Sequence, residues 1–494
     1  MPVTLNGHSL TIEAAVEVAE RGGEVRVSRS SLKRMEKFRS LLERKLGRGE
    51  VVYGVNTGFG SLSDKAVRLG NLKELQLNLI RSHAAGVGAA MPPGVVRAAM
   101  LIALNRLLHG NSAIRPEVAT MVAALINRGV VPYVPSFGSL GASGDLVPSA
   151  HVALTVVGEG KAFLGGELVD SKRALAMSKL KPLVLEAKEG LSLINGTQFT
   201  ASFGCLAVHR GELLLDAANS SASLTGEVLG ACSQSFDERL ISLKAQPGVA
   251  QVAKRIREIT KDSQRFRTEP IPQDPYSIRC VPQVHGSVRE SLTFASRLVV
   301  GEMNSGSDNP VLIDDGTVLH GGNFHAQSVA MALDLLSLTL SYLGVMSLAR
   351  TSLLLSRTPP ETKYMAGKPG LESGLMILQY TATALAAENA KQVYPQSSYP
   401  ASVSGGIEDH ASHGVNAGLK TLRVAKNVSR MLAIELICAS NILGSNFSGI
   451  SSHTARVCER VRRESPLLNG DRSMGEEIEL LGSVILDGEL AKRA

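Results

Sequence analysis

Residues 137–154 read FGSLGASGDLVPSAHVAL, and the rest of the chain is organised around this stretch. Its centre is Ala142-Ser143-Gly144, three small residues followed directly by Asp145. Glycines here allow backbone conformations that side chains forbid, and they let other backbone atoms approach closely. The plainest interpretation is a glycine- and serine-rich loop in which Asp145 caps a helix that starts near Leu146.

Two familiar glycine-rich catalytic motifs do not fit this stretch. The nucleophile elbow of serine hydrolases requires Gly-x-Ser-x-Gly, whereas Gly144 follows Ser143 directly. A phosphate-binding loop ends in Gly-Lys-Ser or Gly-Lys-Thr, which is missing here. A third chemistry does fit: if the Gly144 nitrogen attacks the Ala142 carbonyl and two water molecules leave, a five-membered ring forms. The Ser143 β-carbon then becomes an exocyclic methylene, an electrophile that no standard side chain supplies.

The composition is that of an ordinary globular protein. The chain has 494 residues, of which 44% are hydrophobic and 20% are charged, so it can bury a large core. Tryptophan is absent and aromatic residues make up only 4%, which argues against a base-stacking nucleic-acid binder. The formal charge of +7 comes from scattered lysines and arginines and favours small anionic substrates.

Cysteine usage and hydropathy predict a cytoplasmic protein. The five cysteines are odd in number and contain no Cys-x-x-Cys pair, which indicates a reducing compartment and no zinc site. The first residues carry no basic region followed by an apolar one, as a signal peptide would. The longest uncharged stretches, such as 335–349, are too short for a membrane span and contain hydroxyl side chains, so we expect buried helices.

Short hairpins are expected in the first third of the chain. Residues 3–10 predict a hairpin that turns at Asn6-Gly7, and residues 161–169 predict a second one. Thr11 is placed to cap a short helix. A short strand is expected at 51–52, just before the glycine-rich segment 53–60.

Helices dominate from about residue 189 onward. The uncharged stretches at 335–349 and 374–387 are apolar on most faces, so they must be covered all round in a long-helix bundle or an oligomer core.

Several polar clusters are candidate site segments. Residues 53–60, YGVNTGFG, are expected to form a lid rather than a plain surface loop. Asn195 to Gln198 interrupt an apolar run, and a buried polar cluster is costly unless it is hydrogen-bonded, so we expect it to face a site. Arg279 suits bidentate capture of a carboxylate, the alternative being a surface salt bridge. His83 either contacts the end of its own helix or binds a ligand. Glu408-Asp409-His410 has no further histidine or cysteine at metal-binding spacing, which disfavours a metal site.

Three of these motifs, together with the segment Gln273-Asp274-Pro275-Tyr276-Ser277, resemble the ammonia-lyase and aminomutase family that uses a methylidene-imidazolone (MIO) group. Ala142-Ser143-Gly144-Asp145 is highly specific for that family. The segments 53–60, 195–198 and 273–277 match as well, and in the family's order. The similarity runs from Tyr53 to Glu408, which is nearly the whole chain.

The resemblance implies a role for each candidate residue. Ala142, Ser143 and Gly144 would form the MIO group autocatalytically, with no external cofactor and no metal ion. Tyr53 would be the leading candidate for the general base, and Tyr276 would be a second tyrosine near the electrophile. Arg279 would hold the substrate carboxylate. The remaining implied neighbours of the electrophile are Asn195, Gln273 and Phe324.

Two positions match the branch of the family that acts on histidine. They are His83 and Glu408. A carboxylate such as that of Glu408 can bind or orient an imidazolium ring, whereas an apolar ring would leave it buried and unpaired. The implied reaction is elimination of ammonia from L-histidine to give trans-urocanate, the first step of histidine degradation.

The sequence departs from the family pattern at a few positions near these motifs. Ile407 replaces the expected glutamine before Glu408, and Gln327 stands where a glutamate is usual. Ser149 replaces a leucine. These departures leave the catalytic core intact and bear on substrate preference.

The resemblance also implies the mainly α-helical fold of the ammonia-lyase/fumarase-like superfamily. We expect residues 1–200 to form a smaller N-terminal part with the lid and the electrophile-forming loop, and residues 201–494 to form the central long-helix bundle. The resemblance implies a homotetramer whose active sites combine residues from three chains. A related lyase or aminomutase acting on tyrosine or phenylalanine is the main alternative, and Glu408 is the feature that separates the two. A non-catalytic helical scaffold is a third possibility. An intact mass that lacks the loss of two waters would favour the scaffold.

Overall fold

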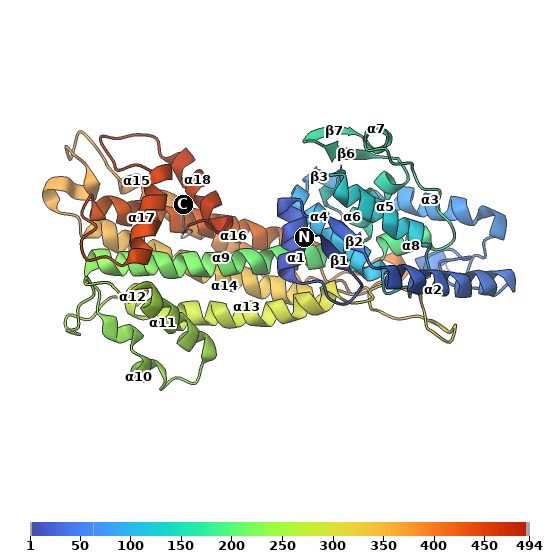
Figure 1. Ribbon diagram of the computed structural model, residues 1–494, viewed down its shortest axis with the longest axis horizontal. Helices are drawn as coiled ribbons and strands as arrows, with labels where there is room; N and C mark the ends of the chain where they lie inside the picture. Colours follow the sequence, from blue (N-terminus) through green and yellow to red (C-terminus); the bar gives the residue numbers. More distant parts are fainter. Residues whose placement is uncertain (1, 63, 491–494) are drawn as a thin grey trace. The chain divides into compact units, whose positions relative to one another are not determined.

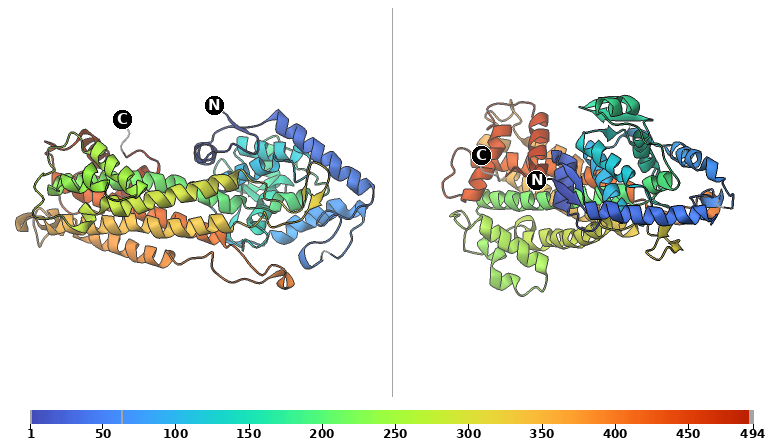
Figure 2. Two further views of the ribbon diagram at one scale, coloured as in Figure 1. Left: turned by 90° about the horizontal axis from the view of Figure 1, so that it is seen from below. Right: turned by 45° about the vertical axis from the view of Figure 1, so that its right-hand side comes forward.

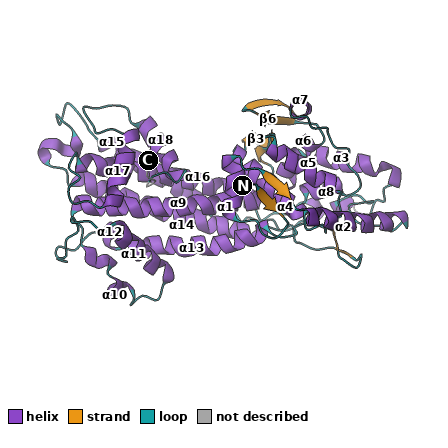
Figure 3. Cartoon of the chain, in the orientation of Figure 1, coloured by secondary structure: helices purple, strands orange, loops and turns teal. Residues whose placement is uncertain are grey.

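The computed structural model describes residues 2–62 and 64–490, without the side chain of Ser61. Helices dominate and the strands are short (Figure 3), so the predicted mainly α-helical fold is confirmed. The chain divides into two compact units. Unit 1 consists of Met1–His209, Ala295–Leu333 and Pro395–Leu419, and unit 2 of Arg210–Phe294, Asp334–Tyr394 and Lys420–Ala494.

Both units are discontinuous in sequence. The first segment of unit 1 ends close to the predicted boundary at residue 200, and two later segments, Ala295–Leu333 and Pro395–Leu419, return to it. The single predicted boundary at residue 200 therefore does not describe the two later segments, which belong to unit 1 although they follow that boundary in the sequence. Their return matters because Phe324 and Glu408 lie in them.

Unit 1 is built on helices whose ends follow local sequence signals. Its helices are α1 (Ile12–Arg21), α2 (Arg29–Gly47), α3 (Leu72–His83), α4 (Pro93–Leu107), α5 (Pro116–Asn127), α6 (Leu146–Val156), α7 (Ser171–Met177) and α8 (Glu189–Ile194). The Thr11 side chain accepts a hydrogen bond from the Ala14 N–H, as predicted for the cap of α1. Gly22 ends the same helix with φ +74°, a conformation that suits glycine.

The strands of unit 1 confirm one predicted hairpin and correct another. Strands β6 (Lys161–Leu164) and β7 (Glu167–Asp170) form the expected antiparallel hairpin. The predicted hairpin at 3–10 is wrong, because β1 (Val3–Leu5) pairs in parallel with β2 (Val25–Val27). The Leu10 N–H bonds to the Asn304 side chain instead of returning to β1.

The other strand pairs are short. They are β3 (Val87–Ala90) with β5 (Pro135–Phe137), β4 (Val131–Pro132) with β6, and β8 (Val311–Leu312) with β9 (Val318–Leu319). The strand expected at 51–52 is not formed. The Asn56 side chain accepts the Val52 N–H at 2.7 Å, so this backbone is held in a turn and not in a ladder.

Long helices form the core of unit 2, in agreement with the predicted bundle. The helices that unit 2 contains wholly or in part are α9 (Gln198–Leu229), α10 (Glu238–Ile241), α11 (Pro247–Ile259), α12 (Tyr276–Arg279), α13 (Val281–Met303), α14 (Gln327–Ser356), α15 (Met376–Gln392), α16 (Gly414–Leu443), α17 (Ser452–Glu464) and α18 (Gly475–Leu486). The long helices α9, α13, α14 and α16 run side by side (Figures 1 and 2).

A buried ion pair joins three of these long helices. Arg350 of α14 donates to both carboxylate oxygens of Glu435 of α16, at 2.6 and 2.9 Å. Thr225 of α9 donates to the same carboxylate at 2.7 Å. Both charged side chains are fully buried, so removing either partner would leave an uncompensated charge in the core.

Helix α14 is long and apolar enough to cross a membrane by length and composition alone. However, 67% of its most apolar stretch is buried inside the fold. Its hydroxyl groups are also used internally: Ser337 pairs with Thr421, and Ser347 donates to the Met431 carbonyl. α14 therefore has the contacts of a core helix.

Candidate active site

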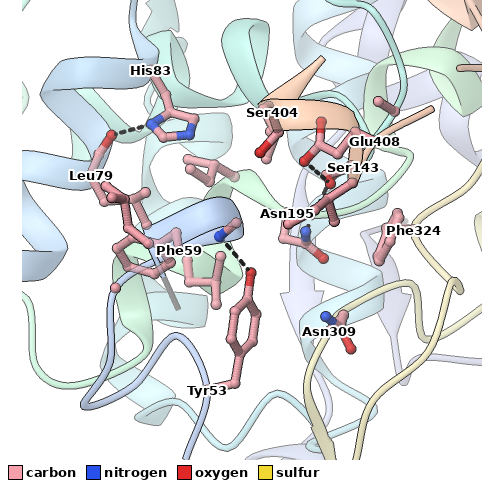
Figure 4. Close-up of a pocket in the computed structure, with 18 of the residues that line it drawn as sticks. Tyr53, Phe59, Leu79, His83, Ser143, Asn195, Asn309, Phe324, Ser404 and Glu408 are labelled. Atoms are coloured by element: carbon pink, nitrogen blue, oxygen red, sulfur yellow. Dashed lines mark hydrogen bonds between the residues drawn. The ribbon is translucent and has the colours of Figure 1, made fainter. Parts of the chain in front are cut away.

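A cavity of about 1090 Å³ lies in unit 1, around the electrophile-forming loop. It is lined by most of the site residues predicted for that part of the chain (Figure 4), namely Tyr53, His83, Ala142, Ser143, Asn195, Phe324 and Glu408. These residues come from six separate stretches of the sequence, and the fold of unit 1 brings them together.

The electrophile-forming loop is packed backbone against backbone. Gly144 has φ +81°, and a Cβ at this position would lie 2.4 Å from the Gly196 carbonyl oxygen. The next N–H along the chain, that of Asp145, donates to the same oxygen at 2.7 Å. Within the described part of the chain the Gly144 N–H donates no hydrogen bond. Only glycine fits at Gly144, and its nitrogen is not engaged by another group.

Asp145 does not cap α6 with its side chain, so the plainest interpretation of the loop is wrong on this point. Its carboxylate instead accepts from the Thr200 N–H at 2.8 Å, the Thr200 hydroxyl at 3.0 Å and the Ser139 hydroxyl at 3.1 Å. Burial raises the pKa of Asp145 to about 6, although these hydrogen bonds lower it. Asp145 thus ties the loop to the start of α9.

A second buried carboxylate supports the same region from behind. Glu302 of α13 accepts a hydrogen bond from Thr197, which directly follows Gly196. Burial raises the pKa of Glu302, and the nearby charge of Asp145 raises it further. The turn that packs against Gly144 is therefore held by its own hydrogen bond to the core.

The Ser143 side chain points into the cavity and contacts a carboxylate. Its hydroxyl donates to Glu408 Oε1 at 2.6 Å, and the Asn195 side-chain amide donates to the Ser143 carbonyl at 3.2 Å (Figure 4). Glu408 is placed by a short antiparallel bridge to Val403. The serine that would become the electrophile is thus flanked by one carboxylate and one amide.

Tyr53 and His83 are held by backbone groups (Figure 4). The Gly60 N–H donates to the Tyr53 hydroxyl oxygen at 3.0 Å. His83 Nδ1 lies 2.8 Å from the Leu79 carbonyl oxygen, so this nitrogen must carry the proton. His83 contacts the last turn of α3, as one interpretation predicted, and it also lines the cavity, so its binding of a ligand stays a prediction.

The charges that line the cavity suit a cationic ligand group. The carboxylates of Glu408 and Asp409 line it, and the described lining residues include no lysine or arginine. Four histidines also line it: His83, His320, His325 and His410. Burial lowers the pKa of His325, and the neighbouring His410 lowers it further. An ammonium or imidazolium group finds carboxylate partners here, whereas a ligand carboxylate finds no lysine or arginine among the described lining residues.

The other predicted site residues belong to unit 2 and do not line this cavity. They are Gln273, Tyr276 and Arg279. Tyr276 is 69% exposed. The guanidinium carbon of Arg279 lies 4.6 Å from the centre of the Tyr276 ring. Arg279 makes no ion pair in the described part of the chain, so the surface salt bridge considered as its alternative role is not formed.

The structure also adds cavity residues that the sequence analysis did not single out. Phe59, Leu79, Asn309, His320 and Ser404 line the cavity. Asn309 lies in a polar run just before Pro310, and His320 directly precedes Gly321-Gly322. In both cases a polar residue stands next to proline or glycine, a pattern typical of loops. This local pattern could have identified them as candidate site residues.

In the described ranges no group of three or more histidine, cysteine, aspartate or glutamate residues could hold a metal ion.

Comparison with known proteins gives relatives over the whole chain. Residues 10–463 match the family described as aromatic amino acid lyase. Histidine ammonia-lyase of Caldanaerobacter subterraneus subsp. tengcongensis is 39% identical over 497 residues, which cover 99% of this chain and 97% of the relative.

Solved structures agree with this match. Tyrosine aminomutase from Streptomyces globisporus superposes with a TM-score of 0.94 at 33% identity, covering 99% of this chain and 98% of the other. Histidine ammonia-lyase from Trypanosoma cruzi superposes with a TM-score of 0.92 at 34% identity, covering 99% and 94%. The chain belongs to the aromatic amino acid lyase family.

Proposed function

We propose that this protein eliminates ammonia from L-histidine to give trans-urocanate. The observation that carries the proposal is the Glu408 carboxylate, 2.6 Å from the Ser143 hydroxyl in a cavity that also contains His83. A carboxylate at that place pairs with an imidazole ring better than with an apolar one. The relatives named histidine ammonia-lyase at about 40% identity support the same substrate.

The residues at the loop fit the MIO group. Ala142 is buried, the Gly144 nitrogen has no competing partner among the described residues, and Ser143 faces the cavity. Asn195 and the Asp145 N–H would hold the loop through the bonds described above. When present, the group supplies an electrophile that makes the amino group of the substrate a better leaving group.

We assign the reaction steps to side chains that line the cavity. Tyr53, with its oxygen held by the Gly60 N–H, takes the β-proton as general base. Glu408 faces the ring nitrogen of the substrate and orients the ring, and His83 contributes a second ring contact through Nε2, the nitrogen that does not face the Leu79 carbonyl. Phe324 packs beside the electrophile and Asn195 lies near the substrate amino group.

A second copy of the chain is needed to complete this site. A volume of about 1090 Å³ is at the upper end of the range for small-molecule pockets, although the substrate is only one amino acid. The lining residues also offer no cation for the substrate carboxylate. We propose that Arg279, Tyr276 and Gln273 of neighbouring copies enter the cavity in a homotetramer, which accounts for the exposed Tyr276 ring.

A specific observation favours the alternative substrates tyrosine and phenylalanine. Ile407 lines the cavity next to Glu408, so part of the ring subsite is apolar. Tyrosine aminomutase is also among the structural relatives. A lyase or aminomutase acting on these amino acids would use the same loop with a different ring subsite.

Near-ultraviolet absorbance with separate amino acids distinguishes these substrates. Elimination conjugates the new double bond with the ring, so each product absorbs, and the enzyme itself contains no tryptophan. We expect a rise with L-histidine and none with L-tyrosine or L-phenylalanine. A rise only with an aromatic substrate would overturn the assignment of Glu408.

Substitution of Ser143 tests the electrophile directly. Ser143→Ala is expected to lower turnover at least about 1000-fold, as loss of a central catalytic group does, with an unchanged helical circular dichroism spectrum. Its intact mass should show no loss of two waters, in contrast to the wild-type chain. A fully active Ser143→Ala variant would exclude the MIO mechanism.

The cytoplasmic location and the absence of nucleic-acid and membrane partners stay predictions from composition.

A further inference from the structure

The segment that carries Glu408 is docked to the rest of unit 1 at several places. On one side, the Ser143 hydroxyl donates to the Glu408 carboxylate at 2.6 Å. On the other, the N–H groups of Ser412 and His413 donate to the carbonyls of Gly141 and Leu140, at 3.2 and 3.0 Å. His410 lies between these two attachments. The contacts of His410 therefore bear on the placement of Glu408 beside Ser143.

His410 is held by a hydrogen bond that it donates to the Gln327 side chain. The Gln327 side-chain nitrogen donates to the Ser397 carbonyl at 3.2 Å, so its oxygen must be the atom that faces His410. His410 Nε2 lies 3.3 Å from that oxygen. Because an amide oxygen only accepts, His410 Nε2 carries the proton.

His325 forms the other contact of His410. The two rings are stacked, with centroids 5.3 Å apart and planes inclined by 10°. The His325 ring also hydrogen-bonds the His410 backbone, while its Nε2 is buried without a partner in the described structure. His325 directly follows Phe324, so the same contact ties the Phe324 loop to the Glu408 segment.

We propose that Gln327 and His410 are positioning residues that hold Glu408 against the electrophile-forming loop. The Gln327–His410 bond and the His325–His410 stack dock the Glu408 segment onto the loop that carries Phe324. Besides this attachment, the segment is held through the Ser143–Glu408 contact and through the N–H groups of Ser412 and His413. The inference rests on the proposed function, since it concerns how Glu408 meets the substrate ring. The proposal also assigns a role to Gln327, one of the departures from the family pattern, as the hydrogen-bond acceptor of His410.

A double-mutant cycle tests this pairing. Gln327→Leu removes the acceptor, His410→Phe keeps a ring in the stack but removes the donor, and the third variant combines both. Each single variant is expected to lower kcat by about tenfold, the worth of one hydrogen bond, with a smaller change in KM. The double variant should be no worse than either single one, because the two residues act as a unit. Gln327→Glu, which restores an acceptor, should recover most of the turnover.

Readouts other than turnover separate positioning from folding. All variants are expected to show the loss of two waters in their intact mass and an unchanged melting temperature. His8→Phe is the matched control, because His8 forms an edge-to-face pair with His109, with centroids 4.4 Å apart, and does not line the cavity. This control should leave kcat unchanged.

Two results would overturn the proposal. One is wild-type kcat in both single variants, and the other is additive losses in the double variant. Failure of the proposed function looks different, because the wild-type chain itself would then fail to convert L-histidine. In that case the cycle is measured with the amino acid that the wild-type protein does convert, and a loss of coupling there equally contradicts the positioning role.

Discussion

The electrophile-forming loop of unit 1 and the Gln273–Arg279 segment of unit 2 are built in opposite ways. Around the loop, each contact comes from the same unit: Gly196 packs on Gly144, and Thr200 and Ser139 bind the Asp145 carboxylate. In the Gln273–Arg279 segment, the backbone is held by the buried Arg350 side chain, which donates to the Ser277 carbonyl at 3.3 Å. The Tyr276 residue of the same segment is nevertheless exposed to solvent.

The difference indicates two separate tasks within one chain. A loop that must bring a nitrogen onto a carbonyl carbon needs crowded, rigid surroundings before any substrate arrives. A segment that contributes an arginine to another copy needs a firm base and an exposed tip. We infer that folding of the chain prepares the first region, and that assembly prepares the second.

Adding a methyl group at Gly144 attacks the crowded region and should have the largest effect. In Gly144→Ala, the new Cβ would meet the Gly196 carbonyl oxygen at 2.4 Å, and φ +81° disfavours any side chain. We expect no loss of two waters in the intact mass and at least about 1000-fold lower turnover.

Gly165→Ala is the matched control for this variant. Gly165 also has positive φ, at +58°, but a Cβ there would meet nothing within 4 Å. It should cost only about 1 kcal/mol of stability through backbone strain and leave turnover intact. Equal effects of the two substitutions would mean that strain, and not crowding, governs the loop.

Mixing two inactive variants tests whether the two regions serve one site from different chains. Arg279→Met should lower kcat/KM about 100-fold, through loss of the carboxylate partner, with the loss of two waters unchanged. Co-expression with Ser143→Ala should restore part of the activity, because some sites then combine an intact loop from one chain with Arg279 from another.

The mixed assemblies are compared with two controls. Arg239→Met removes an exposed arginine whose ion-pair partner is Asp237, and it should leave kcat/KM unchanged. Each inactive variant co-expressed with itself should stay inactive. Absence of any recovery in the mixture would place both residues in the site of a single chain and contradict the shared site.

The smallest expected effect is on the pH dependence of stability. It concerns the buried carboxyl group of Asp145 beside the electrophile-forming loop. The pKa of Asp145 is raised from 3.8 to about 6, so the folded state binds this proton more tightly than the unfolded chain does. Its contribution to stability is complete below pH 3.8 and is lost as the pH rises to about 6. Asp145→Asn removes this loss. Relative to wild type, its free energy of unfolding should rise by up to about 3 kcal/mol across that range.

Denaturant unfolding at a fixed protein concentration measures this difference. Asp170→Asn, at an exposed carboxylate at the start of α7, is the control and should follow the wild-type pH dependence. Parallel pH profiles for wild type and Asp145→Asn would mean that Asp145 ionises without penalty in the folded protein.

Local sequence signals predicted several features of the fold correctly. The Thr11 cap, the hairpin at 161–169 and the long apolar helices follow from hydrogen bonding and periodicity within a few residues. The hairpin at 3–10 failed because the partner of Leu10 is Asn304, far along the chain. The Asp145 cap failed for the same reason, since its partners Thr200 and Ser139 belong to other elements.

The sequence by itself determined which groups the site can offer: three small residues that can cyclise and a tyrosine among glycines, which follow from residue type and close spacing. The resemblance to the family added a histidine and a glutamate as the predicted partners of an imidazole ring. Only the tertiary structure decided that Glu408 lies 2.6 Å from Ser143, and that Tyr276 is exposed in the other unit. Such contacts depend on how distant segments pack, and no short-range pattern encodes that packing.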